Sequence, residues 1–203
     1  MTPQPNRYGF MREVESKLID ELLETIKTEF GELRFLEIGV FTGDTARGIA
    51  RRSKEIGLPC TAAGVDFVQY NPNPPPDCPY TYYAGDSMEQ FRNVTGSYNF
   101  LFVDGCHCVV HASQDFLHYS PFVQVGGYAL FHDTALPTDK FDQEPWPQDH
   151  SYAGKENSKL GVREALKKLG LLQGHRKDWQ FVKEEESNTG LMGMILMKKI
   201  LDL

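Results

Sequence analysis

The sequence lacks the features that mark nucleic-acid-binding and membrane-spanning proteins. It has no run rich in lysine and arginine, and 28 acidic against 21 basic residues give a formal net charge of −7. Phosphate backbones are bound by clustered cations, so nucleic acid is not an expected partner. No stretch of about 18 apolar residues could span a bilayer, and no apolar signal-peptide segment follows Arg7 and Arg12. We therefore expect a cytoplasmic protein that does not contact membranes.

Cysteine is also scarce. The four cysteines are Cys60, Cys78, Cys106 and Cys108. Small secreted domains that depend on disulfides have a denser and more regular set, so we expect reduced thiols.

The remaining composition is that of an ordinary globular domain. Hydrophobic residues make up 40% and charged residues 24% of the chain, both close to the average for folded proteins. A chain of 203 residues can bury about 70% of its unfolded surface around a single core. We therefore predict one domain over residues 1–203.

Helical and strand-like segments alternate along the chain. Val14, Leu18, Leu22 and Ile26 recur every fourth residue and predict an amphipathic helix over residues 10–30, which Gly31 ends. Strands are predicted at 33–38, 60–66, 80–84, 98–104, 128–132, 179–184 and 191–198, and further helices at 44–57, 86–93, 109–119 and 159–171. This order predicts an α/β three-layer sandwich, with a Rossmann-like, mostly parallel seven-stranded sheet and a C-terminal antiparallel hairpin.

Three connections carry further predictions. Thr42 or Asp44 is expected to cap the helix at 44–57, and residues 121–127 are expected to form a turn. Residues 134–157 are irregular and rich in proline. They follow the end of a strand, where ligands bind in open α/β sheets, so they suit a lid; a surface insertion is the alternative.

A glycine-containing loop follows the first predicted strand. It reads Glu37-Ile-Gly39-Val40-Phe-Thr-Gly43, and its glycines allow a sharp turn and a close backbone approach to a ligand. The loop has neither the G-x-G-x-x-G pattern of dinucleotide sites nor the Gly-Lys-Ser/Thr end of a phosphate loop. Such turns also occur for packing reasons, so the loop alone does not identify a ligand.

An acidic residue follows each of the next three strands. These residues are Asp66, Asp86 and Asp104. Carboxylates at strand ends can accept hydrogen bonds from a ribose diol or an adenine amine, and they suit a cationic sulfonium better than a phosphate. One such aspartate can simply form a turn or a helix cap, but three in succession favour a ligand site.

Together these segments resemble class I S-adenosylmethionine-dependent methyltransferases over about residues 35–133. The chain looks most like the small methyltransferase-24-like domains, in which strand four ends V-D-G-x-H and strand five reads G-G-x-x-x-x-H-D-T. Here these segments are residues 103–107 (VDGCH) and 126–134 (GGYALFHDT). The resemblance implies S-adenosyl-L-methionine as cofactor and a small-molecule acceptor; whether the chain forms a homo-oligomer stays open.

The resemblance also implies site residues by motif position. The cofactor-binding positions are Glu37, Gly39, Val40, Gly43, Asp66, Asp86, Ser87 and Asp104. The first four would line the methionine part, Asp66 would hold the ribose hydroxyls, and Asp86 with Ser87 would reach the adenine. Asp104 would face the methyl group.

A second group of polar residues stands at the ends of strands four and five. Related sugar and catechol O-methyltransferases hold a divalent cation here, which implies Asp104, His132 and Asp133 as ligands of Mg²⁺ or Mn²⁺. His132 stands where the relatives have a second Asp or Asn. Imidazole suits Zn, Fe, Ni or Mn better than Mg, so the identity of the metal stays open.

The expected activity is O-methylation of a small hydroxylated acceptor, such as a sugar or a phenol. His107 would act as general base beside Asp104, because an imidazole with an ordinary pKa near 6.5 can accept the hydroxyl proton. The alternative for His107 is a structural role at the start of the following helix.

Three other interpretations stay open. The same residues could serve a metal-dependent, hydroxylase-like enzyme, or the domain could bind the cofactor without catalysis. Cys106, Cys108 and His111 could bind zinc, although a Cys-x-Cys pair without a second cysteine pair seldom completes a tetrahedral structural site.

Overall fold

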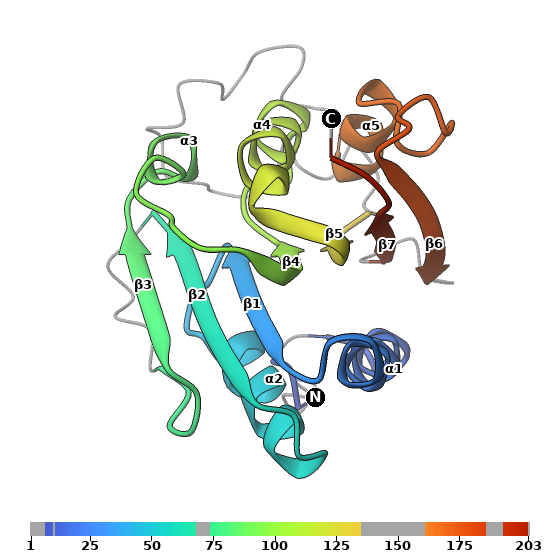
Figure 1. The fold of residues 1–203 in the computed structure, drawn as a ribbon. Coiled ribbons are helices and arrows are strands. Elements are labelled where there is room, and N and C mark those ends of the chain that lie inside the picture. Colours follow the sequence, from blue (N-terminus) through green and yellow to red (C-terminus); the bar gives the residue numbers. More distant parts are fainter. Residues whose placement is uncertain (1–6, 10, 68–73, 135–160, 186–192, 203) are drawn as a thin grey trace, which may run out of the picture.

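A seven-stranded sheet forms the centre of the computed structural model, which describes residues 7–9, 11–67, 74–134, 161–185 and 193–202 (Figure 1). Its strands are β1 (Leu33–Ile38), β2 (Cys60–Asp66), β3 (Tyr80–Ala84), β4 (Tyr98–Val103), β5 (Val123–Phe131), β6 (Trp179–Glu185) and β7 (Met194–Lys199). The strand order is β3-β2-β1-β4-β5-β7-β6. The first five strands are parallel, and β7 runs antiparallel to both β5 and β6. The predicted fold class is confirmed.

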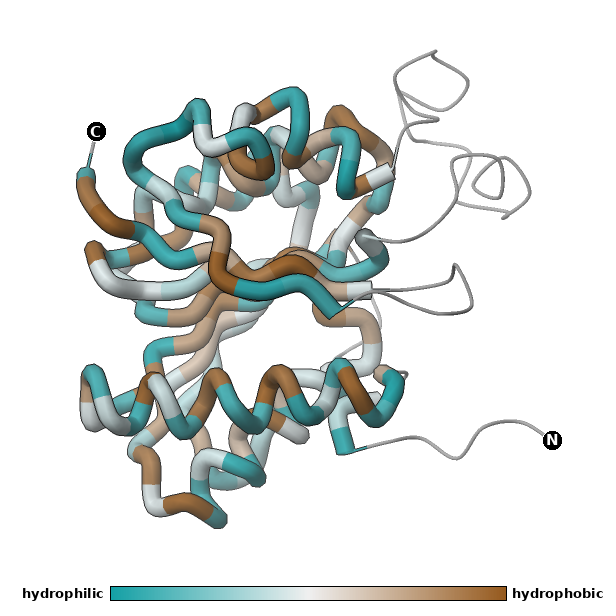
Figure 2. The backbone as a smooth tube through the Cα atoms, turned by 90° about the vertical axis from the view of Figure 1, so that its right-hand side faces the viewer, coloured by the Kyte–Doolittle hydropathy of each residue, from teal (hydrophilic) through white to brown (hydrophobic). Residues whose placement is uncertain are grey.

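Helices cover both faces of the sheet. They are α1 (Glu13–Phe30), α2 (Asp44–Glu55), α3 (Ser87–Gln90), α4 (Val109–Tyr119) and α5 (Val162–Lys168), with a 3₁₀ turn at Ser120–Phe122. One face carries α1 and α2, and the other carries α3, α4 and α5 (Figures 1 and 2). No helix in the described part of the chain is both long and apolar enough to cross a membrane.

Two hydrophobic cores lie on opposite sides of the sheet. Phe100 and Phe102 of β4 pack with the α1 and α2 side, whereas Leu101 between them packs with Phe116 and Phe131 on the α4 side. Side chains of a strand alternate between faces, so a strand buried on both faces is apolar throughout. All six residues of β4 are buried, which explains why its sequence pattern located it so closely.

The first helix has the predicted amphipathic character. Leu18, Leu22 and Ile26 are buried, and Gly31 ends the helix with a left-handed φ of 71°. Val14, in contrast, is 46% exposed, so the apolar stripe begins one turn later than predicted. Glu15 occupies the buried face at that turn.

Several predicted boundaries were wrong. The helices predicted at 86–93 and 159–171 end at Gln90 and Lys168. Strand β5 begins at Val123, within the predicted turn, because residue 123 already pairs with Tyr98 before an irregularity in the ladder. Helix α2 is capped by Gly43 in a left-handed conformation and not by Thr42 or Asp44, whose side chains hydrogen-bond to each other at 2.6 Å. Apart from Thr134, the predicted lid over 134–157 lies outside the described residues.

Candidate active site

The carboxyl ends of the central parallel strands meet at one edge of the sheet. Backbone pairing continues past them, because the Asp104 amide donates to the Ile38 carbonyl at 2.8 Å and the His132 amide donates to the Val103 carbonyl at 3.1 Å. The strand order changes direction between β1 and β4. Open α/β sheets bind ligands outside their strand ends at such a point, so this edge is the expected site.

The loop after β1 makes the predicted tight turn. Gly39 has a φ of +89°, and a Cβ atom there would lie 2.2 Å from the backbone oxygen of Asp104. Only glycine therefore lets the β1 loop approach the end of β4 this closely. Val40 is buried, and Gly43 turns the chain into α2 with a φ of +79°.

Glu37, the acid before this turn, is completely buried. Neither of its carboxylate oxygens has a hydrogen-bond partner among the described residues. Burial raises its pKa well above the usual value, and the nearby carboxylates of Asp104 and Asp66 raise it further. A buried carboxylate without donors is costly, so the position suits a ligand that brings a donor or a positive charge.

Asp66 supports the same loop from the end of β2. Its Oδ2 atom accepts a hydrogen bond from the Phe41 amide at 2.6 Å. Phe41 has a φ of 49°, which is unusual for a bulky residue, and its side chain is 48% exposed. A carboxylate has more acceptor sites than this single bond uses, so Asp66 can also accept a ligand hydroxyl.

The two residues predicted at the adenine end already have partners. The Asp86 carboxylate caps α3 by accepting a bond from the Met88 amide at 2.9 Å. The Ser87 hydroxyl donates to Oδ1 of the buried Asp115 at 2.6 Å. Both side chains thus help to hold α3 in place. For Asp86 this is the helix-capping role that the sequence analysis gives as the alternative to ligand binding.

Four polar residues from the ends of β4 and β5 form a cluster. Oδ1 of Asp104 lies 3.0 Å from Nδ1 of His132 and 3.3 Å from Nε2 of His107. The same His107 atom lies 3.1 Å from Oδ2 of Asp133. The structure therefore brings together the residues predicted for catalysis and for metal binding. Asp133 has a φ of 55°, a strained value that its surroundings enforce.

The charges of this cluster depend on one another. Burial disfavours the Asp104 carboxylate, but His132 and His107 more than offset it, so its pKa lies below the usual value. Burial likewise disfavours the imidazolium forms of both histidines. The neighbouring carboxylates nevertheless raise the pKa of His107, and they raise the pKa of His132 well above its usual value. Burial raises the pKa of Asp133. The cluster is therefore able to hold a proton or a cation between its carboxylates.

Glu15 of α1 is a member of this region that the sequence reasoning missed. Its Oε2 atom lies 3.7 Å from Nε2 of His132, and its Oε1 atom accepts a hydrogen bond from the Gly193 amide at 2.9 Å. Arg12 binds the same carboxylate through its side chain and its backbone amide. Helix α1 contains several acidic residues, so its sequence does not single out Glu15 as the one beside His132. The only sequence signal is that Glu15 is the third residue of the helix, where an acid can bond back to the N-cap residue Arg12.

Three of the clustered residues are arranged as a set of metal ligands. One donor atom each from Asp104, His107 and Asp133 lies within 4.8 Å of the other two. His107 thus joins the two predicted carboxylates, while His132 lies against Asp104. Two carboxylates and an imidazole fit a divalent cation such as Mn²⁺, so the donor chemistry suits the implied metal.

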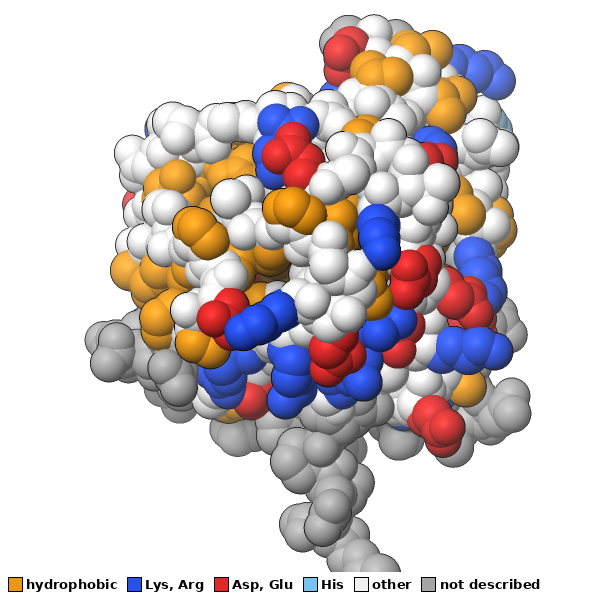
Figure 3. Space-filling view, turned by 60° about the horizontal axis from the view of Figure 1, so that its bottom comes forward, with side chains coloured by type: hydrophobic (Ala, Val, Ile, Leu, Met, Phe, Trp, Pro, Cys, Tyr) orange, Lys and Arg blue, Asp and Glu red, His pale blue; other side chains and the backbone are white. Residues whose placement is uncertain are grey.

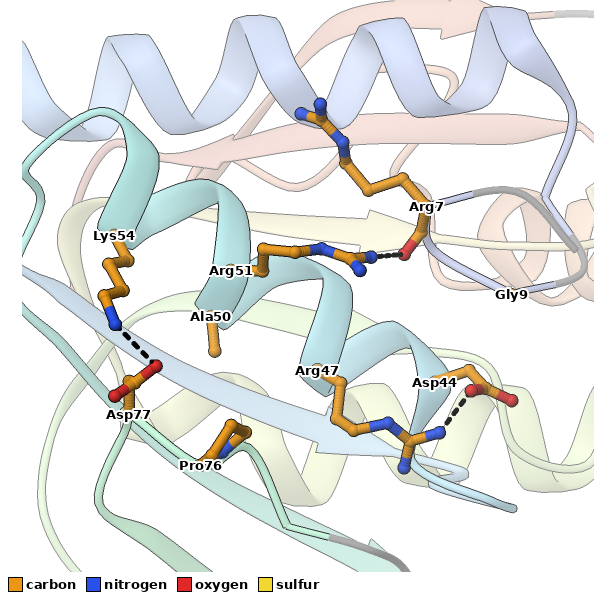
Figure 4. Close-up of a pocket in the computed structure, with 9 residues that line it drawn as sticks. All are labelled: Arg7, Gly9, Asp44, Arg47, Ala50, Arg51, Lys54, Pro76 and Asp77. Atoms are coloured by element: carbon orange, nitrogen blue, oxygen red, sulfur yellow. Dashed lines mark hydrogen bonds and ion pairs between the residues drawn. The ribbon is translucent and has the colours of Figure 1, made fainter.

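A separate pocket of about 510 Å³ lies along α2 and contains none of the predicted site residues (Figure 4). Its lining includes Arg7, Arg47, Arg51 and Lys54. Arg47 is paired with Asp44, Lys54 with Asp77, and Arg51 with the Arg7 carbonyl. Acidic and basic side chains are intermixed on this side of the molecule (Figure 3). The pocket is therefore a mixed-charge surface feature.

Comparison with known proteins agrees with this architecture. Residues 36–134 match the model of a protein family described as a methyltransferase domain. A search of curated proteins found none that matches the sequence. The sheet, with β7 antiparallel beside β5, has the fold of solved methyltransferase structures. The matched residues include the β1 loop, Asp66, Asp104 and Asp133.

Solved structures with this fold include three methyltransferases. The O-methyltransferase TomG from Streptomyces achromogenes, in complex with SAM, is 14% identical with a TM-score of 0.62, covering 94% of this chain and 81% of its own. The O-methyltransferase from Bacillus cereus in complex with SAH is 14% identical, with a TM-score of 0.61. The match covers 93% of this chain and 82% of the B. cereus chain. MycE from the mycinamycin biosynthetic pathway, in complex with Mg, SAH and mycinamycin VI, is 18% identical, with a TM-score of 0.58. The match covers 95% of this chain and 51% of the MycE chain.

Proposed function

We propose that the protein transfers the methyl group of S-adenosyl-L-methionine to an oxygen atom of a small hydroxylated acceptor. The observation that carries this proposal is the buried carboxylate of Glu37, which has no partner among the described residues and lies at the end of β1. The α-ammonium group of the cofactor would supply both the missing donor and the missing positive charge. The structural neighbours crystallised with SAM or SAH support this choice of ligand.

The remaining cofactor contacts follow from the strand ends. Gly39, Val40 and Gly43 would line the methionine part, and Asp66 would accept from the ribose hydroxyls while it holds the Phe41 amide. Asp86 and Ser87 remain the proposed adenine contacts. Because both side chains already have partners, a bound adenine would have to share or exchange those hydrogen bonds.

At the acceptor side, the residues of the cluster would position a hydroxyl and remove its proton. Asp104 and Asp133 hold the His107 imidazole between them, so Nε2 of His107 is placed to receive a proton. A divalent cation held by Asp104, His132 and Asp133 would lower the pKa of the acceptor hydroxyl, and His107 would then act as the base and not as a metal ligand. Methyl transfer from a sulfonium to oxygen is an in-line displacement, so alignment of the two substrates is the main task of the protein.

Calorimetric titration with S-adenosylhomocysteine tests the cofactor part of the proposal. Glu37→Gln keeps the shape of the side chain but cannot form a carboxylate against the ammonium group of the ligand, and we expect at least a tenfold loss of affinity, equivalent to about 1.4 kcal/mol. Glu13→Gln, at an exposed position on α1, is the matched control and should bind like the wild type. Equal binding by all three proteins, or no binding by any of them, would contradict the proposal.

A second candidate function is that of a metal-dependent, hydroxylase-like enzyme. The observation that favours it is the presence of two imidazoles, His107 and His132, beside the two carboxylates of the cluster. Histidine and carboxylate ligands suit ferrous iron in oxygenases. Oxygen consumption by the iron-loaded protein, in the absence of S-adenosylmethionine, would favour this function over methyl transfer.

A further inference from the structure

A second group of potential metal ligands lies beside the candidate active site. It consists of Cys106, Cys108 and His111, one donor atom of each lying within 4.8 Å of the others. Sγ of Cys108 is 3.0 Å from Nδ1 of His111. The sequence spacing did not by itself favour a zinc site, but the fold places all three donors together.

The start of α4 explains why these side chains meet. Cys108 is the N-cap of the helix, and its sulfur accepts a hydrogen bond from the His111 amide at 3.4 Å. His111 lies in the first turn of the helix, so its imidazole reaches back to the capping sulfur. His107, between the two cysteines, contacts Asp104 and Asp133. Neighbouring residues of one loop thus belong to two distinct clusters.

Burial and charge at this position also suit a cation. The imidazole of His111 is 5% exposed, whereas both cysteines are partly exposed, so an ion can enter from the thiol side. Asp115 is buried one helical turn beyond His111, and its carboxylate form favours positive charge near the imidazole, although burial raises the pKa of Asp115 to about 7. A thiol at a helix N-terminus is also well placed to bind as thiolate, because the helix dipole favours negative charge there.

We propose that Cys106, Cys108 and His111 form a zinc site, with the fourth position of the tetrahedron open to water. Two sulfur donors and one imidazole nitrogen are ligands that zinc prefers and that Mg²⁺ and Ca²⁺ avoid. Zinc-to-ligand distances of about 2.3 Å for sulfur and about 2.0 Å for nitrogen set neighbouring donors roughly 3.5 Å apart. The Cys108 to His111 contact would therefore open by about half an ångström. Binding releases the thiol protons to solvent.

The proposed ion would connect the end of β4 to the first turn of α4. The same loop carries Asp104 and His107, so the zinc would hold the backbone that presents the candidate active site. The site itself does not depend on methyl transfer, since it uses none of the cofactor-binding residues. Its hard-donor neighbour at Asp104, His107 and Asp133 has no sulfur ligand, which allows the two sites to be distinguished spectroscopically.

Cobalt substitution in the full chain tests the site directly. Reduced, chelator-treated protein titrated with Co²⁺ should show thiolate-to-cobalt charge-transfer absorption that saturates at one equivalent and disappears when Zn²⁺ is added. The Cys106→Ser/Cys108→Ser variant should lack this absorption. Cys60→Ser/Cys78→Ser removes the same number of thiols away from the site and should keep it. Competition with a chromogenic chelator should show zinc binding at least tenfold weaker in the first variant only.

Two further variants exclude misfolding, and metal binding at the neighbouring cluster, as explanations of the result. His111→Ala keeps both thiols and should weaken zinc binding at least tenfold, with an unchanged far-ultraviolet circular dichroism spectrum. Asp133→Asn removes a carboxylate from the other cluster and should leave the charge-transfer absorption intact. The proposal is overturned if reduced wild-type protein shows no thiolate absorption with cobalt, or if the absorption survives in Cys106→Ser/Cys108→Ser.

Discussion

At the scale of single residues, the candidate site depends on charges that are held away from water. Glu15 and His132 are both buried, and they face each other across the junction of α1 and β5. Burial alone would raise the pKa of Glu15, but the nearby His132 imidazolium and hydrogen bonds from Arg12 lower it from its usual 4.5 to about 2. The carboxylate is thus stabilised more strongly in the folded chain than in the unfolded one.

Glu15→Gln is expected to destabilise the protein at neutral pH and to matter less in acid. Because the folded pKa is lowered, the stabilisation is fully present above pH 4.5 and is lost as pH falls toward 2. This interval corresponds to about 3 kcal/mol at roughly 1.4 kcal/mol per pH unit. Urea unfolding of both proteins at pH 7 and pH 3 measures the difference. Glu13→Gln, at an exposed position on α1, should change stability by less than about 0.5 kcal/mol at either pH.

At the same scale, the sequence identified most residues of the site but not their contacts. Asp104, His107, His132 and Asp133 stand at strand ends that an apolar pattern locates, so their proximity could be predicted. Glu15 could not be, because its role arises from the packing of α1 against the end of β5, about 120 residues away in the chain.

At the scale of elements, the strands were predictable and some of their ends were not. Strands buried on both faces, such as β4, are apolar from end to end, and their bounds follow from composition. The start of β5 contains Gly126 and Gly127, which locally resemble a turn. Only pairing with β4 shows that residues 123–127 belong to the strand. Tertiary pairing overrides local preference there.

The β1 loop gives a prediction at this scale. Gly39 and Gly31 both have positive φ, but a Cβ at Gly39 would overlap the Asp104 backbone, whereas nothing lies within 4 Å of one at Gly31. Gly31→Ala should therefore cost only the strain of the left-handed conformation, about 1 kcal/mol. Gly39→Ala should cost at least about 3 kcal/mol, because the backbone at Asp104 must move as well.

Thermal unfolding of the two glycine variants measures this difference, and calorimetry with S-adenosylhomocysteine measures its effect on the site. Binding should be lost or strongly weakened in Gly39→Ala and retained in Gly31→Ala. Similar losses of stability in the two variants would show that the close approach between the β1 and β4 loops is not required.

At the scale of the whole molecule, the site joins elements that are far apart in the chain. Asp104 and His107 follow β4, His132 and Asp133 follow β5, and Glu15 comes from α1, where it also holds the Gly193 amide before β7. Burial raises the pKa of Asp133, and the two imidazoles only partly offset this cost of burying its carboxylate. A divalent cation at this position would stabilise that carboxylate further and, with it, the folded chain as a whole.

Mn²⁺ should therefore raise the melting temperature of the protein. A ligand that binds only the folded state contributes about 2.7 kcal/mol at a hundredfold excess over its dissociation constant. For a chain of about 200 residues this corresponds to a rise of roughly 5–10 °C. Differential scanning fluorimetry with and without Mn²⁺ measures the rise, which should vanish in Asp104→Asn/Asp133→Asn. It should persist in Cys106→Ser/Cys108→Ser, because the thiols removed in that variant have little affinity for Mn²⁺. An equal rise in the doubly neutralised variant would mean that Mn²⁺ binds elsewhere, and the role of the carboxylates as metal ligands would then be wrong.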